Sequence, residues 1–328
     1  MPNVISFQNS IERTEGKDRA LLLGNGFSIR HFSYNTLLEK ADLEKDDPLR
    51  ALFNVLKTSD FEVVIKALED ASVVEAAYGN KQQSDKFDKD ANRLREALVH
   101  AIRTTHPAHR DDIADEIPSC SNFLEWFGRI LTLNYDLLLY WIILNQTKSF
   151  QDGFGLGEET SGFRGPFKRE ANCNIYNLHG GLHLFLTETG EVEKRIMGPN
   201  GVIEAIAETI LRDKHLPIYV AEGTSRAKLR KINSIPYLKY CYEKLAESSG
   251  SFFVYGSSAR PNDEHIYRAL FESRIDHLYF CIHLPTANVQ AIDGELARYK
   301  RLYNSQIKYT FVDAESARVW DAQGNRGA

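Results

Sequence analysis

The sequence has few cysteines, little excess charge and no long apolar run, and each shortage excludes a class of protein. Four cysteines stand far apart among 328 residues, with no C-x-x-C pair: Cys120, Cys173, Cys241 and Cys281. This spacing indicates neither a zinc ribbon nor a disulfide framework, so we expect neutral thiols in a reducing compartment. The formal net charge of -5 argues against nucleic acid or an anionic membrane as the principal partner, because both require a basic surface.

Membrane and export signals are also lacking. No apolar run approaches the roughly 20 residues of a membrane span. The first residues, Met1-Pro2-Asn3-Val4, lack the charged start and the apolar core of a signal peptide. We therefore expect a cytoplasmic protein with no membrane partner.

One apolar run ends abruptly at two glycines separated by a single residue. It begins at Arg19 and leads into Gly24-Asn25-Gly26-Phe27-Ser28. A short run bounded by glycine predicts a strand buried on both faces of a parallel sheet. The glycines permit a sharp turn and close approach to a ligand, and a helix expected near Tyr34–Lys40 would offer free N–H groups to an anion such as phosphate. Because Ile29 stands where a third glycine completes the dinucleotide fingerprint, a strand, turn and helix without a ligand is an alternative.

Residues 41–126 show helical rather than strand periodicity. Apolar residues recur at Phe61, Val64, Ile65 and Leu68, and again at Leu94, Leu98 and Ile102. The polar stretch 79–86 is expected to be an exposed connection, and Pro107 and Pro118 are expected to mark breaks. We predict a helical insertion over 41–126 within a domain of residues 19–328, preceded by an N-terminal extension over 1–18.

Strand-like and helical runs alternate in the remainder of the chain. The expected strands cover 130–133, 174–178, 217–220, 252–255, 277–283 and 308–312, and the expected helices cover 137–144, 227–246, 263–273 and 289–303. A glycine-rich loop is expected over 151–157 and a hairpin around Thr189-Gly190. Such alternation implies right-handed crossovers, so the predicted fold class is α/β, a Rossmann-like doubly wound and mostly parallel sheet.

Polar residues directly follow four of the expected strands. They are Gly24–Ser28; Thr132, Asn134 and Asp136; His179 before Gly180-Gly181; and Gly256-Ser257-Ser258. Ligands of open parallel sheets bind beyond the carboxyl ends of the strands, so we expect these four groups to converge. Each also has a purely structural alternative. Asn134 could cap the next helix with Asp136 in its first turn, and His179 or the Gly256 segment could be turn residues.

Other polar residues favour structural roles. His179 and His183 have i, i+4 spacing, but Gly180-Gly181 breaks any helix between them and no metalloprotease glutamate is present, so no metal site is expected. Lys228, Arg230 and Lys231 are expected on a solvated helix face rather than in a phosphate clamp.

In the order of its four motifs the chain resembles the sirtuin-like family, and within it the divergent bacterial branch of NAD-consuming antiviral-defence proteins. Gly24, Gly26 and Ser28 match the family's Gly-Ala-Gly-x-Ser loop at the NAD pyrophosphate, with Asn25 in place of alanine. Thr132, Asn134 and Asp136 match its Thr-Gln-Asn-x-Asp motif at the nicotinamide ribose, with Leu133 in place of glutamine. His179 falls at the family's catalytic histidine, and Gly256-Ser257 resembles its Gly-Thr-Ser loop.

The chain departs from the sirtuin deacylases in two places. It lacks their zinc module of paired cysteines, and it has Arg30-His31-Phe32-Ser33-Tyr34 where they have a Pro-Asp-Phe-Arg segment. Both departures argue against acyl-lysine peptide chemistry. NAD cleavage requires neither feature.

The resemblance implies an NAD+ glycohydrolase that depletes NAD in bacterial antiphage defence, with NAD as its substrate and no metal. It gives the catalytic roles to Asn134, Asp136 and His179. The implied NAD-binding positions are Gly24, Asn25, Gly26, Phe27, Ser28, Thr132, Gly256, Ser257 and Ser258. Because free NADase activity is toxic to its host, we expect control by a trigger, a co-encoded partner protein or homo-oligomerisation. The alternatives are a non-catalytic NAD- or ADP-ribose-binding regulatory subunit, and a protein deacylase or ADP-ribosyltransferase.

Overall fold

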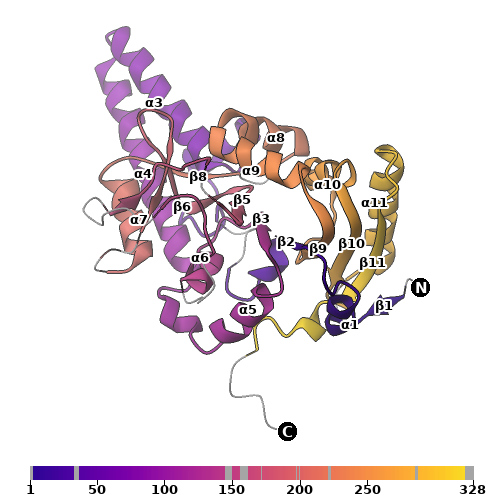
Figure 1. The fold of residues 1–328 in the computed structure, drawn as a ribbon. Helices are drawn as coiled ribbons and strands as arrows, with labels where there is room; N and C mark the ends of the chain where they lie inside the picture. The colour runs from indigo at the N-terminus through magenta and orange to yellow at the C-terminus, as the bar shows by residue number, and fades with distance from the viewer. Residues whose placement is uncertain are drawn as a thin grey trace.

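A seven-stranded, all-parallel sheet forms the centre of the molecule (Figure 1). The computed structural model describes residues 3–32, 37–144, 150–155, 162–170, 172–196, 198, 200–220, 223–284 and 287–321. The strands of this sheet are β1 (Val4–Ile5), β2 (Arg19–Leu23), β3 (Arg129–Thr132), β5 (Ile175–Asn177), β9 (Ser249–Tyr255), β10 (Arg274–Ile282) and β11 (Lys308–Asp313). Their spatial order is β1-β11-β10-β9-β2-β3-β5.

The order of the strands reverses once, between β2 and β9. From β2 the chain passes outward through β3 to β5, returns to β9 on the other side of β2, and passes outward again through β10 to β11. This is the order of a doubly wound sheet, and it confirms the predicted fold class. Strand β1, from the expected N-terminal extension, joins the far edge parallel to β11.

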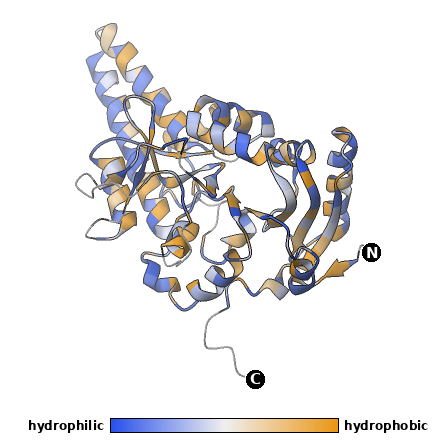
Figure 2. Ribbon diagram, in the orientation of Figure 1, coloured by the Kyte–Doolittle hydropathy of each residue, from blue (hydrophilic) through white to orange (hydrophobic). Residues whose placement is uncertain are grey.

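Two hydrophobic cores cover the two faces of this sheet. Leu21 and Leu23 of β2 contribute to one core and Leu22 to the other, and all three are fully buried. Alternate residues of a strand point to opposite faces, which explains why the run 21–23 is apolar without interruption. Figure 2 shows hydrophobic residues along the strands and hydrophilic residues over much of the surface helices.

The helices divide between these faces. The first core takes residues from α1 (Phe7–Glu12), α2 (Pro48–Val55), α3 (Phe61–Ala77), α4 (Lys81–Thr105), α5 (Ile117–Leu124), α6 (Leu138–Ile143) and α7 (Val202–Leu211). The second takes residues from α8 (Ser225–Ser234), α9 (Pro236–Ala246), α10 (Glu264–Phe271) and α11 (Val289–Leu302). Within the described residues there are also four short 3-10 helices: η1 (Asn25–Phe27), η3 (Arg110–Ile113), η4 (Pro261–Asp263) and η5 (Glu315–Ala317).

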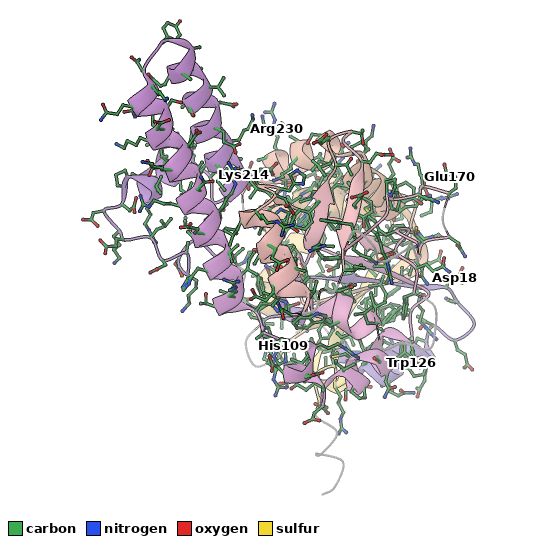
Figure 3. The ribbon with its side chains drawn as sticks, turned by 90° about the vertical axis from the view of Figure 1, so that its left-hand side faces the viewer. Asp18, His109, Trp126, Glu170, Lys214 and Arg230 are labelled. Atoms are coloured by element: carbon green, nitrogen blue, oxygen red, sulfur yellow. The ribbon has the colours of Figure 1, made fainter. Side chains whose placement is uncertain are left out.

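The helical segment between β2 and β3 contains a long antiparallel hairpin, α3 and α4, which extends beyond the rest of the molecule in Figures 1 and 3. The expected exposed connection over 79–86 is shorter than predicted, because α4 already begins at Lys81. Pro107 follows the end of α4, whereas Pro118 lies in the first turn of α5, where its missing N–H costs no helical hydrogen bond.

A second, antiparallel sheet has the order β4-β7-β6-β8. Its strands are β4 (Phe163–Arg164), β6 (Gly180–Leu186), β7 (Val192–Arg195) and β8 (Pro217–Tyr219). The hairpin expected at Thr189-Gly190 joins β6 to β7. The assignment of 217–220 to the parallel sheet is wrong, since β8 pairs antiparallel with β6. A short buried apolar run has the same pattern in either sheet, so its partner could not be inferred from its residues.

Two local predictions require correction. Residues 34–36 of the helix expected near Tyr34–Lys40 lie outside the described part of the chain, and 37–40 form turns rather than helix. The turn after β2 is instead the short helix η1, closed by hydrogen bonds from Phe27 N to Gly24 O and from Ser28 N to Asn25 O. The expected turn at 179–181 is also shorter, because Gly180 already begins β6. Within the expected loop 151–157, residues 156–157 lie outside the described part.

No helix in the described ranges combines the length and the apolar character needed to cross a bilayer.

Candidate functional site

The loops after β2 and β9 are in direct main-chain contact at the reversal point of the sheet. Gly24 N donates to Tyr255 O at 2.8 Å, and Gly26 N donates to Gly256 O at 2.7 Å. A Cβ on Gly24 would lie 2.7 Å from Gly256 O, and a Cβ on Gly26 would lie 2.7 Å from the Gly256 Cα. Gly256 itself has a φ of +76°. These glycines are therefore required for the contact between the two loops, independently of any ligand.

Asn134 links the end of β3 to the first of these loops. Its Nδ2 donates to Gly24 O at 3.1 Å and to the Ser28 Oγ at 3.0 Å, while its main-chain N donates to the Thr132 Oγ1 at 3.0 Å. The residue is only 3% exposed, and its Oδ1 has no hydrogen-bond partner among the described residues. Asn134 thus brings three of the sequence-predicted positions together and retains one buried acceptor for a further donor.

Asp136 lies two residues before α6 (Leu138–Ile143), the helix that follows β3. Its Oδ1 accepts from Leu138 N at 2.8 Å, so Asp136 precedes the first turn of α6 and does not lie in it. Asn134 does not cap this helix, because its Oδ1 has no hydrogen-bond partner among the described residues. Leu137 N donates to the His106 Nε2 at 3.0 Å, and the His106 Nδ1 lies 2.9 Å from Pro107 O. His106 is therefore neutral with its hydrogen on Nδ1, and burial lowers its pKa. Sequence reasoning missed His106, which lies 30 residues before Asp136.

His179, between β5 and β6, faces a second histidine that sequence reasoning also missed. The Nε2 atoms of His179 and His265 are 3.3 Å apart, and the ring centroids are 5.6 Å apart with an interplanar angle of 18°. The centroid separation exceeds the nitrogen separation by 2.3 Å, twice the distance from an imidazole centre to its nitrogen. The two nitrogens therefore point straight at each other, as in an N–H···N hydrogen bond.

The neighbouring hydrogen bonds fix which ring donates. The His179 ring donates one hydrogen to the main chain of Leu133, so its Nε2 is an acceptor. Ser225 Oγ accepts from His265 N at 2.8 Å and lies 3.1 Å from the His265 Nδ1, within reach of donating its hydroxyl hydrogen to that nitrogen. His265 then carries its hydrogen on Nε2 and donates it to His179, whose Nδ1 donates to the main chain of Leu133. Burial is the largest cause that lowers the pKa of both histidines, to about 4 for His265 and well below 6.5 for His179. Both rings are neutral near pH 7.

Asp263 completes a group that could ligate a metal. Ligand atoms of His179, Asp263 and His265 all lie within 4.8 Å of one another. However, the Lys228 ammonium donates to the Asp263 Oδ1 at 2.9 Å, and its charge contributes to the lowered pKa of both histidines. The same repulsion opposes a bound cation, and the lone pair of the His179 Nε2 already accepts a hydrogen from His265. The geometry thus favours a proton-sharing pair over a metal centre.

The lysines of α8 differ from the expected solvated face. Lys228 is 5% exposed and is paired with Asp263, and the Lys231 side chain is 20% exposed and is paired with Asp60 and Glu62. Arg230 is exposed, as expected. Burial of Lys228 is tolerated because its charge is paired and hydrogen-bonded. His183 lies apart from His179, with its ring stacked on Tyr140 at 5.1 Å.

The remaining sequence-predicted positions differ in accessibility. Phe27 is buried against Trp320, with ring centroids 5.2 Å apart, and Ser257 Oγ pairs with the Tyr267 hydroxyl at 2.6 Å. The exposed positions are Asn25, Gly26 and Ser258. Two surface clefts, of about 580 and 370 Å³, are lined by other residues. The first is lined by residues 271–273, 275–276 and 303–307, and the second by residues of α1, α5 and η5 and their flanks. In this structure Asn134 and His179 are thus enclosed by protein.

The fold and this cluster define a class: an α/β protein with a doubly wound sheet and a buried polar cluster of Asn, Asp and His side chains at the reversal point of its strands. Within that class the chain belongs to the family of the domain of unknown function DUF4917, whose model matches residues 21–320. No curated protein matches the chain at a significant level.

Proposed function

We propose that the protein is an NAD+ glycohydrolase that converts NAD+ and water to nicotinamide and ADP-ribose. One observation carries the proposal. Three of the four sequence motifs, around Gly24, Asn134 and Gly256, form one hydrogen-bonded group at the carboxyl ends of β2, β3 and β9. The fourth, at His179, is hydrogen-bonded to the main chain of Leu133, the residue before Asn134. This is the end of a doubly wound sheet at which nucleotides bind.

The chemistry requires few groups, because nicotinamide leaves as a neutral molecule and needs no acid to protonate it. Water attacks the ribose C1′, the bond from C1′ to the pyridinium nitrogen breaks with its electron pair on that nitrogen, and the proton of the water passes to His179. Asn134 orients the nicotinamide amide or the attacking water through its unpartnered Oδ1. Asp136 stabilises the cationic ribose or helps to place Asn134. A neutral His179 is able to accept the proton.

In this structure the side chains around His179 are inaccessible to a substrate, which supports the proposal that activity is controlled. The His179 Nε2 accepts from His265, its Nδ1 faces Leu133, and the residue is 4% exposed, so the ring cannot reach a substrate as it stands. We place the protein in the bacterial cytoplasm, where its four free cysteines suit a reducing environment. There a trigger, a co-encoded partner or homo-oligomerisation opens the site during phage infection, and NAD depletion arrests the host.

The test is nicotinamide release from NAD+ by the purified protein, alone and with extract of host or infected cells. His179→Ala and Asn134→Ala are expected to lower the rate on the order of 10²-fold or more. Asn177→Ala is the matched control, because Asn177 is also a buried amide at the end of a strand but donates to the Tyr237 hydroxyl. Release that all three variants retain would contradict the assignment of the site.

A regulatory subunit that binds NAD or ADP-ribose without cleaving it is the second candidate, and the enclosure of Asn134 and His179 favours it. It predicts protection of the protein by NAD+ against thermal unfolding with no nicotinamide release under any condition. A deacylase or ADP-ribosyltransferase predicts acyl transfer from an acetyl-lysine peptide, or label on protein from labelled NAD+.

A further inference from the structure

Helix α8 contacts the His179–His265 pair at one end and the helical hairpin at the other. Three of its polar residues, Ser225, Lys228 and Lys231, are spaced by three and lie on one side of the helix. In Figure 1, α8 lies between the base of the α3–α4 hairpin and α10.

The first turns of α8 hold the segment that carries His265. Ser225 Oγ bonds to both the main-chain N and the Nδ1 of His265, at 2.8 and 3.1 Å. Lys228 Nζ donates to Asp263, two residues earlier, at 2.9 Å. These contacts fix the orientation of the His265 ring. They thereby also fix the hydrogen bond that the His265 Nε2 donates to the His179 Nε2.

The last turn of α8 holds the start of the hairpin. Lys231 Nζ donates to the Asp60 Oδ2 and to the Glu62 Oε2, both at 2.7 Å. Asp60 in turn begins α3, because its Oδ1 accepts from Glu62 N at 3.0 Å. The Asp60 side chain is only 7% exposed, so separating it from Lys231 leaves a buried carboxylate without its cation, which is costly. The hairpin therefore cannot shift at its base without moving α8 or breaking this pair.

We propose that α8 couples the α3–α4 hairpin to the candidate active site: displacement of the hairpin moves α8, withdraws Ser225 from His265, and releases the His179 Nε2 to accept a proton. This coupling would regulate the proposed NAD-cleaving site, and to that extent it rests on the proposed function. The contacts themselves predict a response that needs no NAD, because two sites joined through one rigid element influence each other reciprocally.

Hydrogen exchange and nicotinamide release, measured on the full-length protein, test the coupling together. Lys231→Met breaks the contact with the hairpin. It is expected to speed exchange of the His265 amide, which Ser225 holds, by about tenfold or more. Arg230→Met is the matched control, since it removes the neighbouring exposed cation of the same helix and is expected to leave this amide unchanged. Lys231→Arg, which keeps the charge pair, is expected to restore slow exchange.

The reverse experiment decides the matter if Lys231→Met does not fold. Ser225→Ala leaves Lys231 in place and is expected to speed exchange of the Glu62 amide at the start of α3. If Lys231→Met leaves the His265 amide as slow as in the wild type, or if Ser225→Ala leaves the Glu62 amide unchanged, the coupling is overturned.

Nicotinamide release separates this failure from failure of the proposed function. Faster exchange together with raised release supports both proposals. Faster exchange with no release in any variant, alone or with extract of infected cells, retains the coupling and rejects the glycohydrolase. Release that occurs without any response of exchange retains the glycohydrolase and rejects the coupling.

Discussion

Gly26 donates its amide hydrogen to Gly256 O at 2.7 Å, across the point where the order of the strands reverses. The residues are 230 positions apart, yet neither has room for a Cβ against the other. The two loops thus form one main-chain unit, and Asn134 is attached to that unit through Gly24.

This contact predicts that substitution by alanine lowers the stability unequally at two glycines of similar conformation. A Cβ on Gly256 would lie 2.4 Å from Phe27 N, whereas a Cβ on Gly79, with a φ of +82°, has no atom within 4 Å. Gly79→Ala is expected to lower the free energy of unfolding by about 1 kcal/mol through backbone strain alone. Gly256→Ala is expected to cost about 2 kcal/mol more, or to prevent folding, because main-chain atoms must move. Urea unfolding measures both, and equal losses would contradict the close contact.

Asn134 and Ser28 are expected to depend on each other. Asn134→Ala leaves Gly24 O and the Ser28 Oγ without their shared donor and is expected to cost about 1–3 kcal/mol of stability. Ser28→Ala removes only one of these bonds and is expected to cost less. The double variant is expected to lose less than the sum of the two single losses, because the variants share one contact. Additive losses in urea unfolding would show that the contact contributes nothing.

The buried pair of histidines predicts loss of stability in acid. The His265 pKa is lowered from 6.5 to about 4, with burial as the main cause, assisted by Lys228 and opposed by Asp263. The free energy of unfolding therefore has its full value above about pH 6.5 and decreases as the pH falls to about 4. In this range the unfolded chain binds a proton at His265 that the folded chain does not bind. The loss is on the order of 3 kcal/mol for a group this buried. His265→Gln is expected to flatten the fall in urea-unfolding free energy between these pH values, and an unchanged slope would exclude His265 as its source.

Lys228 is expected to decide whether a metal binds beside His179. In the wild type, Zn²⁺ is expected to leave the thermal unfolding temperature unchanged, because the Lys228 ammonium is paired with Asp263. Lys228→Met removes that charge and leaves two neutral imidazoles and a carboxylate whose ligand atoms lie within 4.8 Å of one another. Zn²⁺ is then expected to raise the unfolding temperature. Stabilisation of the wild type by Zn²⁺ would show that the repulsion is too weak to exclude a cation.

The residues near Asn134 show which parts of the candidate site could be predicted from the sequence. Its position after an apolar strand was sufficient to predict that it would meet Gly24 and Ser28, because the carboxyl ends of parallel strands share one edge of the sheet. His106 and His265 could not be found in the same way. Each lies in or beside a helix remote from that edge in sequence, and neither has a local pattern that distinguishes a buried histidine from an exposed one.

The sequence by itself determined the fold class, the helical character of the chain between β2 and β3, and the strand ends at which polar residues gather, because these follow from periodicity and from the position of glycine. Only the tertiary structure decided that β8 pairs with β6, that Lys228 is buried, and that His265 occupies the proton-accepting nitrogen of His179. Pairing and burial depend on which distant segments meet, and the period of a single segment carries no information about its partner.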